Sequence, residues 1–202
     1  MARRENWSVG ELIVTKGIRA GKKLKLQKVL KFFVCVPAAI VADRYFASAA
    51  MHNGAYTVAN GGIPGDGLAH NVTCAQTAVD AEDTNGILTI TGLDVDGKTI
   101  TEDITPNAGV TVQGTKAFKK VTSIVGSGWV AGGGDDTIVI GFGELVGLPD
   151  LVAAASDILM VGFNTALVNA PTVTVDPAVL SKNTVTTPTG DATKQLRILY
   201  QV

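Results

Sequence analysis

The chain has 202 residues, of which 46% are apolar and only 17% are charged. This length accommodates one domain with an extension or two small domains, and the charged fraction lies below the roughly 25% that is usual for soluble proteins. A surface so poor in charge suits burial against other subunits, and the 23 glycines with abundant threonine argue for strands joined by tight turns and against a helical fold.

Charge and composition both divide the chain near residue 55. Residues 1–44 hold ten Lys or Arg and three acids, a net charge of +7, whereas residues 45–202 hold seven bases and fifteen acids, a net charge of −8. The segment before residue 55 contains a single threonine, and the sequence after it is rich in Thr, Val, Gly and Asp. We therefore predict a basic N-terminal arm over residues 1–54 and a β domain over residues 55–202.

The predicted arm contains short extended pieces at residues 11–15 and 23–26, the second with leucines alternating with lysines as in a strand with one solvated face. Beyond them two alternatives stay open: residues 34–40 continue the alternation as a strand, or Pro37 opens a short helix that ends near Met51. The alternation also leaves open whether residues 23–41 pair with the chain's own sheet or with that of a neighbour.

The uncharged run over residues 32–42 has eleven residues, whereas a membrane-spanning helix needs roughly 20. Residues 21–50 imitate the order of a signal peptide, but they begin late in the chain and basic residues precede them. We expect an internal buried segment and no membrane partner, with a cleaved signal as the alternative.

Strand patterns recur through the predicted β domain after a glycine-rich loop at residues 60–67. Residues 86–91 and 98–104 flank Asp96-Gly97, a dipeptide that favours a hairpin because the turn needs positive φ. Further strands are predicted at residues 110–112, 118–125, 136–142, 157–163, 171–176, 183–186 and 194–202. Short strands at this spacing are typical of a sandwich or barrel. We predict an all-β fold, a jelly-roll-like β-sandwich with an extended N-terminal arm.

No constellation of catalytic residues emerges from the sequence. The two histidines, His52 and His70, lie in loop-like sequence, and we expect both at the surface, with a joint metal site of His70 and Cys74 as the alternative. Cys35 and Cys74 are expected to be small buried apolar residues. We predict no catalytic residues, no metal site and no cofactor.

The order of several short motifs carries a resemblance. Residues 89–106 (TITGLDVDGKTITEDITP) lead into residues 114–124 (GTKAFKKVTSI), and the sequences GW, DTIVIGFG, GLP and SKNTV follow at residues 128, 136, 147 and 181. This order resembles the β-sandwich structural proteins of tailed-bacteriophage virions, in particular the capsid cement or decoration proteins. The resemblance covers residues 70–202, and the first 54 residues lie outside it.

The resemblance implies a protein of the capsid surface, often trimeric, that binds the major capsid protein and bridges neighbouring capsomers. We expect the arm to be the main anchor, since a flexible arm can reach a neighbour and become ordered on binding. Lysines would meet acidic capsid surface and aromatic residues would be buried as apolar anchors. The predicted interface residues are Trp7, Lys22, Lys23, Lys25, Lys28, Lys31, Phe32 and Phe33.

Four other functions compete with that of a capsid cement protein. A tail, neck or baseplate component would share the same architecture, and a carbohydrate-binding module would use the tips of the sandwich. Nucleic-acid binding by the basic arm is less favoured, because its aromatic residues accompany no known nucleic-acid motif. Enzymatic activity is not expected.

Overall fold

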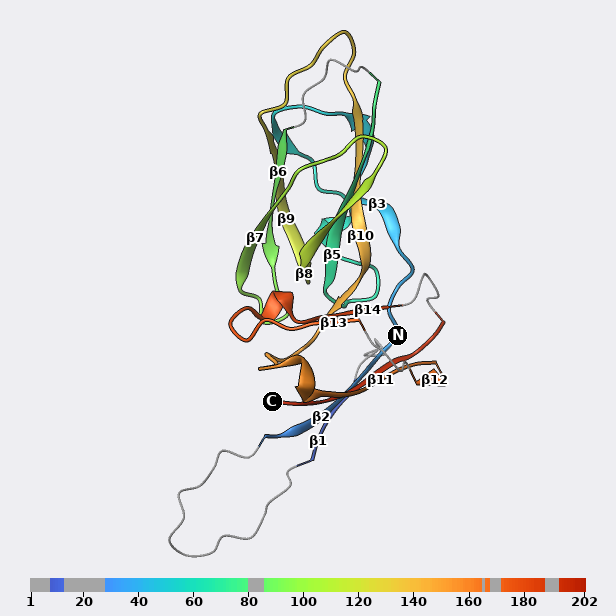
Figure 1. Cartoon of the computed structure of the whole chain (residues 1–202). Helices are drawn as coiled ribbons and strands as arrows, with labels where there is room; N and C mark the ends of the chain where they lie inside the picture. Colours follow the sequence, from blue (N-terminus) through green and yellow to red (C-terminus); the bar gives the residue numbers. More distant parts are fainter. Residues whose placement is uncertain (1–7, 13–27, 80–85, 165, 168–171, 188–192) are drawn as a thin grey trace, which may run out of the picture.

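The computed structural model describes residues 8–12, 28–79, 86–164, 166–167, 172–187 and 193–202. The protein is all-β, as predicted, and its strands form antiparallel sheets in an elongated body (Figure 1). In the described part of the chain the helical elements are three short 3₁₀ turns: η1 (Asn60–Gly62), η2 (Ala155–Asp157) and η3 (Leu180–Lys182).

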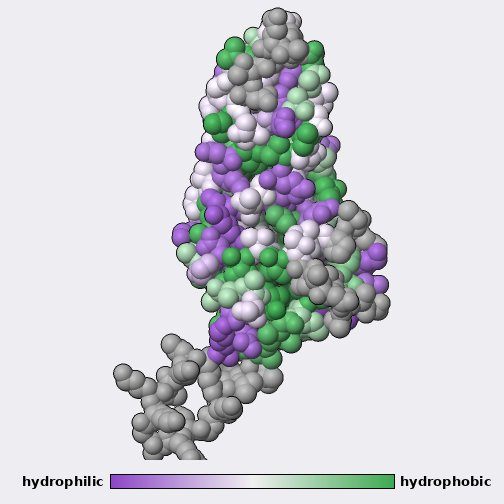
Figure 2. Space-filling view, viewed as in Figure 1, coloured by the Kyte–Doolittle hydropathy of each residue, from purple (hydrophilic) through white to green (hydrophobic). Residues whose placement is uncertain are grey.

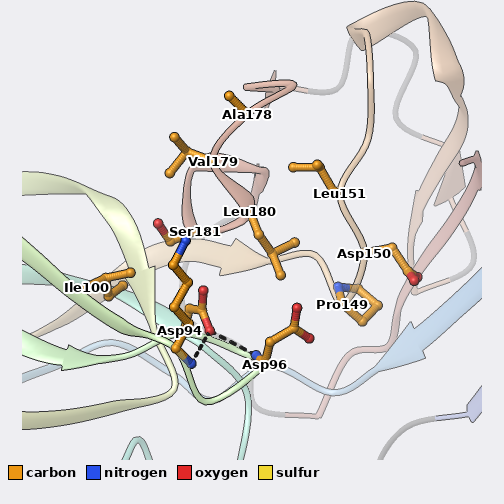
Figure 3. Close-up of a pocket in the computed structure, with 11 residues that line it drawn as sticks. Asp94, Asp96, Ile100, Pro149, Asp150, Leu151, Ala178, Val179, Leu180 and Ser181 are labelled. Carbon is orange, nitrogen blue, oxygen red and sulfur yellow. Dashed lines mark hydrogen bonds between the residues drawn. The ribbon is translucent and has the colours of Figure 1, made fainter.

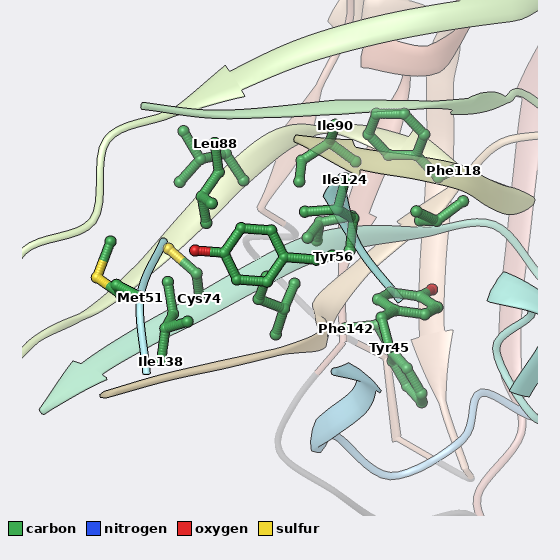
Figure 4. Packing of buried hydrophobic residues seen from close by; sticks show 14 of the residues in the cluster. Tyr45, Met51, Tyr56, Cys74, Leu88, Ile90, Phe118, Ile124, Ile138 and Phe142 are labelled. Carbon is green, nitrogen blue, oxygen red and sulfur yellow. The ribbon is translucent and has the colours of Figure 1, made fainter. Parts of the chain in front are cut away.

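The upper part of the body in Figure 1 is a sandwich of two sheets, which we call B and C. Sheet B contains β3 (Val41–Ala50), β5 (His70–Thr77), β8 (Thr111–Phe118), β10 (Thr137–Gly147), β13 (Val173–Thr174) and β14 (Thr184–Thr186). Sheet C contains β4 (Gly54–Tyr56), β6 (Ile87–Leu93), β7 (Thr99–Ile104) and β9 (Lys120–Ser127). Apolar side chains from both sheets, among them Ile90, Ile124 and Phe142, fill the space between them (Figure 4).

The β6–β7 hairpin turns at Gly97, whose φ of 78° is the conformation that the Asp-Gly dipeptide predicts. Glu102 on β7 then spans the gap between the two sheets. Its carboxylate accepts hydrogen bonds from the backbone N–H groups of Thr115 (2.7 Å) and Lys116 (3.2 Å) on β8. Glu102 therefore closes one side of the sandwich.

The lower part of the body contains a second core, which packs on one face of a five-stranded sheet A. Its strands are β1 (Ser8–Leu12), β2 (Leu30–Cys35), β11 (Ile158–Phe163), β12 (Ala166–Leu167) and β15 (Leu196–Gln201). Strand β10 connects the two cores, because its Ile138 and Ile140 pack in the upper core and its Val146 packs in the lower one. The chain after residue 54 is thus one part of a larger body with two cores.

The structure decides the alternatives left open in the N-terminal segment. Residues 30–35 form β2, which lies between β1 and β15 of the chain's own sheet A. The short helix considered from Pro37 to Met51 is wrong, because residues 41–50 form β3 and pair with β10. The predicted boundary between residues 54 and 55 falls at no break in the sheets, and within residues 28–54 the chain is not a separate arm.

Strand β5 is an element that sequence patterns did not predict. Seven of its eight residues, those at 70–76, are buried or nearly so, and they include the polar residues His70, Asn71 and Gln76. A strand buried on both faces does not alternate between apolar and polar residues. Its polar side chains are bonded inside the protein; the amide of Asn71, for example, donates to Gly114 O (3.1 Å) and accepts from Leu145 N (3.1 Å).

Candidate docking surfaces

One face of sheet A is apolar and faces away from the lower core. Successive residues of a strand point to opposite faces, and residues paired across strands share a face. Phe32 is paired with Leu199, and Leu199 is paired with Met160, so these three side chains form a row across β2, β15 and β11. With their neighbours they form what we call the base face: Leu30, Phe32, Val34, Met160 and Leu199.

The base face is at least partly open to solvent. Phe32 is 36% exposed, and the other four side chains are half-buried; among the described residues, none of the five belongs to either core cluster. Figure 2 shows apolar surface gathered over the lower half of the body on the side that it displays. Removing a large apolar side chain from water stabilises a contact by about 1.5–3 kcal/mol when burial is complete. A row of such side chains on a flat sheet is suited to docking on another protein.

The base face also carries a positive charge. Arg197, paired with Val34, is exposed on the same face. In the sequence, residues 13–27 hold five Lys or Arg and no acidic residue. A partner surface for the base face is therefore expected to combine apolar and acidic groups.

The structure corrects part of the predicted interface. Trp7, Lys22, Lys23 and Lys25 lie outside the described residues. Lys28 forms an ion pair with Asp157, and Lys31 forms one with Asp150 at 2.5 Å. Because these two ammonium groups bind carboxylates of their own chain, they attach sheet A to the segment between β10 and β11 more directly than they serve an outside partner.

The two adjacent phenylalanines have opposite roles. Phe33 is 3% exposed and packs in the lower core, so its prediction as an interface anchor is wrong. Phe32 points to the other face, where it is accessible. Alternation along β2 separates them, and the sequence alone did not show which of the two faces the core.

A second exposed apolar surface lies at the opposite end of the molecule. Among the described large apolar residues, the three most exposed are Val79 (62%), Val130 (59%) and Val110 (52%). They come from the segments after β5, after β9 and before β8, and with Ile87 at the start of β6 they form what we call the tip. The first two of these segments lie at the upper end of the body in Figure 1.

Buried polar contacts hold the tip segments in place. The carboxylate of Asp136 accepts hydrogen bonds from Val79 N (2.6 Å) and from the side chain of Gln76 (2.6 Å). The side chain of Asn53 donates to Trp129 O and accepts from Trp129 N, both at 2.9 Å, as a neighbouring strand would. Hydrogen bonds therefore hold the segments that contain Val79 and Val130 against the sandwich.

Of the acidic residues that the structure describes in the tip segments, Asp135 is exposed and Asp136 is buried. Residues 77–88, 104–112 and 125–138 contain five acidic residues and no Lys or Arg. Sequence reasoning did not find this surface, although isolated valines beside acidic, glycine-rich turns are a signal that could have indicated it. The molecule therefore has an exposed apolar region at each end.

His70 is buried, which overturns its expected place at the surface. Its side chain is 1% exposed, and its two ring nitrogens face Asp66 Oδ2 (2.8 Å) and Gly143 O (3.2 Å). Burial raises the pKa of the nearby Cys74 thiol to about 12. Within the described ranges, no three His, Cys, Asp or Glu side chains form a group that could hold a metal ion. His52 is exposed, as expected.

A cleft of about 330 Å³ lies between the β6–β7 turn, the segment after β10 and η3 (Figure 3). Asp94 in this cleft accepts hydrogen bonds from the N–H groups of Asp96 (3.0 Å) and Lys98 (2.9 Å), which fixes the turn. Asp150 accepts from the Tyr200 hydroxyl (2.5 Å) and binds Lys31. These carboxylates have structural partners, and the described residues that line the cleft include no histidine or cysteine that could act as a base or nucleophile.

Comparison with known protein families, with curated proteins and with solved structures yields no match to this chain. In the part of the chain that the structure describes, no helix has the length and apolar character needed to cross a membrane.

Proposed function

We propose that this chain is a structural protein of a tailed-bacteriophage virion, which binds the outside of the capsid and stabilises it by bridging neighbouring capsomers. The observation that carries the proposal is the pair of exposed apolar surfaces, the base face and the tip, at opposite ends of one all-β body. A bridging protein needs at least two contact surfaces on a body stiff enough to transmit force between them. The order of motifs from residue 89 to residue 185 supports the same class of protein.

The base face is the surface that we assign to the capsid. Its apolar row supplies contact area, and Arg197, exposed on the same face, complements an acidic surface of the major capsid protein. Of the two phenylalanines in the predicted interface, this assignment retains Phe32. Leu199 and Met160 take the place of Phe33. The lysines at positions 22, 23 and 25 remain predicted contacts.

Weak individual contacts suffice for this function because they act on a lattice. Once one surface of a subunit is bound, the second surface faces its partner at a high effective concentration, so that the two contacts together bind far more tightly than either alone. No cofactor is required by such a mechanism. Many copies bound around a capsid would resist separation of the capsomers.

The proposal is tested by counting bound copies. Capsids that lack this chain are incubated with the purified full-length protein, separated from free protein by sedimentation, and analysed by quantitative mass spectrometry. The proposal predicts saturable binding of many copies per capsid. A handful of copies per complete particle, with none on isolated capsids, would instead indicate a tail, neck or baseplate component.

A deletion of residues 1–54 is not a suitable test of the proposal. It would remove β1 and β2 from sheet A and would remove β3 from its place beside β10. Loss of capsid binding by such a truncated chain would report unfolding, so point substitutions on the exposed surfaces are required.

A further inference from the structure

We infer that Arg197, held in place by Gln195, binds one carboxylate of the major capsid protein and so fixes how this chain is oriented on the capsid. The inference rests on the proposed function and gives one side chain of the base face a specific role. Arg197 lies on β15 and is exposed, with Val34 on β2 and Gly162 on β11 as its cross-strand neighbours. Residues two apart on a strand share a face, so Arg197 stands beside Leu199 and its apolar row.

Arg197 is a cation without an anion of its own chain. Among the described residues it forms no ion pair, whereas the nearby Lys28 and Lys31 both do. Its two cross-strand neighbours offer no side-chain acceptor either, since Val34 is apolar and Gly162 has no side chain. A carboxylate that reaches the base face therefore meets a guanidinium that no described acidic side chain occupies.

Gln195 holds this guanidinium in position. Its Oε1 atom accepts a hydrogen bond of 2.8 Å from Arg197 Nε. A guanidinium has five N–H groups in a planar fork, so this bond leaves the four on the two terminal nitrogens for a partner. Those nitrogens can donate in parallel to both oxygens of one carboxylate, which gives direction as well as attraction. Because the side chain is already restrained, less conformational entropy is lost on binding.

The surroundings of Arg197 favour a carboxylate of a protein as its partner. Carboxylates and phosphates both match the fork, but the adjacent row is apolar, and a protein surface combines carboxylates with apolar side chains. The apolar row supplies contact area that tolerates small displacements, whereas a displaced arginine loses both parallel hydrogen bonds. The ion pair therefore contributes specificity and orientation more than it contributes area.

Three variants of the full-length protein test the inference. Arg197→Gln removes the charge, Arg197→Lys keeps the charge but removes the planar fork, and Gln195→Ala removes the group that holds the fork. The matched control is Lys120→Gln, which removes an equal charge from an exposed residue of β9 in the upper sandwich. Circular dichroism and thermal unfolding confirm that every variant is folded.

Cosedimentation with capsids that lack this chain measures the affinity of each variant at several salt concentrations. We expect Arg197→Gln to bind roughly tenfold more weakly than the wild type, and Arg197→Lys to bind severalfold more weakly, because an ammonium group is a point charge without the fork. Lys120→Gln should bind as the wild type does. Salt should weaken the wild type more than Arg197→Gln, since the variant lacks an ion pair that salt screens.

Gln195 is a positioning residue, and its role has a measurement of its own. When Gln195 is replaced by Ala, the advantage of arginine over lysine at position 197 should shrink, because the fork is no longer aligned. The single and combined variants form a double-mutant cycle that measures this coupling. An advantage that is equally large with and without Gln195 would contradict its positioning role.

Amidation of the capsid identifies the group that Arg197 meets. Treatment of capsids with a carbodiimide and ethanolamine converts accessible carboxylates to neutral amides, and electron microscopy confirms that the treated capsids are intact. The difference in affinity between the wild type and Arg197→Gln should disappear on these capsids. A difference that persists would overturn the assignment of a carboxylate and would indicate a phosphate instead.

The outcomes separate this inference from the proposed function. A wild type that does not bind capsids contradicts both. Leu199→Glu tests the base face itself, with Ile63→Glu, at an exposed apolar residue outside that face, as its control. Loss of binding in Leu199→Glu together with undiminished binding of Arg197→Gln would leave the capsid role intact and overturn the contact of Arg197 alone.

Discussion

The carboxylate of Asp66 and the imidazole of His70 form a buried hydrogen bond of 2.8 Å at the junction of the two cores. Asp66 also accepts hydrogen bonds from the N–H groups of Ala38 (2.7 Å) and Leu68 (2.9 Å), so one carboxylate joins the β2–β3 connection to the segment before β5. The second ring nitrogen of His70 faces Gly143 O on β10.

Replacement of Asp66 by Asn is expected to lower the free energy of unfolding by about 3 kcal/mol, because it leaves His70 buried without its carboxylate partner. Burial by itself would raise the pKa of Asp66, but the hydrogen bond and charge of His70, with the N–H groups of Leu68 and Ala38, outweigh it and lower the pKa. The stabilisation is therefore present above about pH 4 and is lost as the pH falls through the folded-state pKa.

Thermal unfolding of the wild type and of Asp66→Asn between neutral and acidic pH measures this effect. The difference in stability should shrink on acidification. Asp43→Asn, at an exposed aspartate of β3, is the control and should change stability little at any pH. A difference that stays constant down to pH 3 would contradict the role of the Asp66 charge.

A second prediction concerns Glu102. Its carboxylate accepts hydrogen bonds from backbone N–H groups of β8, as the carbonyl groups of a neighbouring strand would. Glu102→Ala leaves the N–H groups of Thr115 and Lys116 without this acceptor and should cost about 1–3 kcal/mol of stability. Urea unfolding measures the cost, and amide hydrogen exchange at the two N–H groups should accelerate. Asp103→Asn, which removes an exposed carboxylate from the same strand, should leave both measurements almost unchanged.

A close approach between strands makes Gly141 irreplaceable. A Cβ atom at this position would lie 1.9 Å from Val41 O on β3, so Gly141→Ala has to push β3 away from β10. We expect a loss of about 3 kcal/mol or more, beyond the usual cost of an inserted methyl group. At Gly134 a Cβ would meet only Val79 Cγ1 at 3.5 Å, an ordinary contact. Gly134→Ala is therefore the matched control, and equal stability of the two variants would refute the close packing of β3.

The two thiols should be inert in the folded protein. Burial, and for Cys35 also the charge of Asp66, raises the pKa of each thiol to about 12. Since the thiolate is the reactive form, Ellman's reagent at pH 8 should detect no thiol before unfolding and two thiols after it. Rapid reaction of either cysteine under native conditions would contradict its buried position.

Alternation of apolar and polar residues predicted those strands that have one buried face and one exposed face. The hairpin at Asp96-Gly97 and the alternation in residues 86–91 and 194–202 gave strands that the structure confirms as β6 and β15. Strand β5 was missed, because its burial on both faces removes the alternation on which such predictions depend. The helix considered after Pro37 was wrong, because pairing with β10 decided the conformation of residues 41–50.

The candidate site was less predictable than the fold. The sequence identified an aromatic pair at positions 32 and 33, but only the three-dimensional packing shows that Phe33 fills the lower core while Phe32 faces outward. The tip was not predicted, since Val79, Val110 and Val130 come from three separate segments that meet only in the folded protein.

Binding of capsids by Phe32→Glu tests the central claim most directly. Phe32 lies on the accessible face of β2, whereas its neighbour Phe33 packs in the lower core. The substitution at Phe32 therefore probes the base face with little effect on the core. In a cosedimentation titration against capsids that lack the chain, we predict that Phe32→Glu remains folded and loses at least tenfold in affinity, while Ile63→Glu binds as the wild type does. Undiminished binding by folded Phe32→Glu would contradict the claim that the base face is the docking surface.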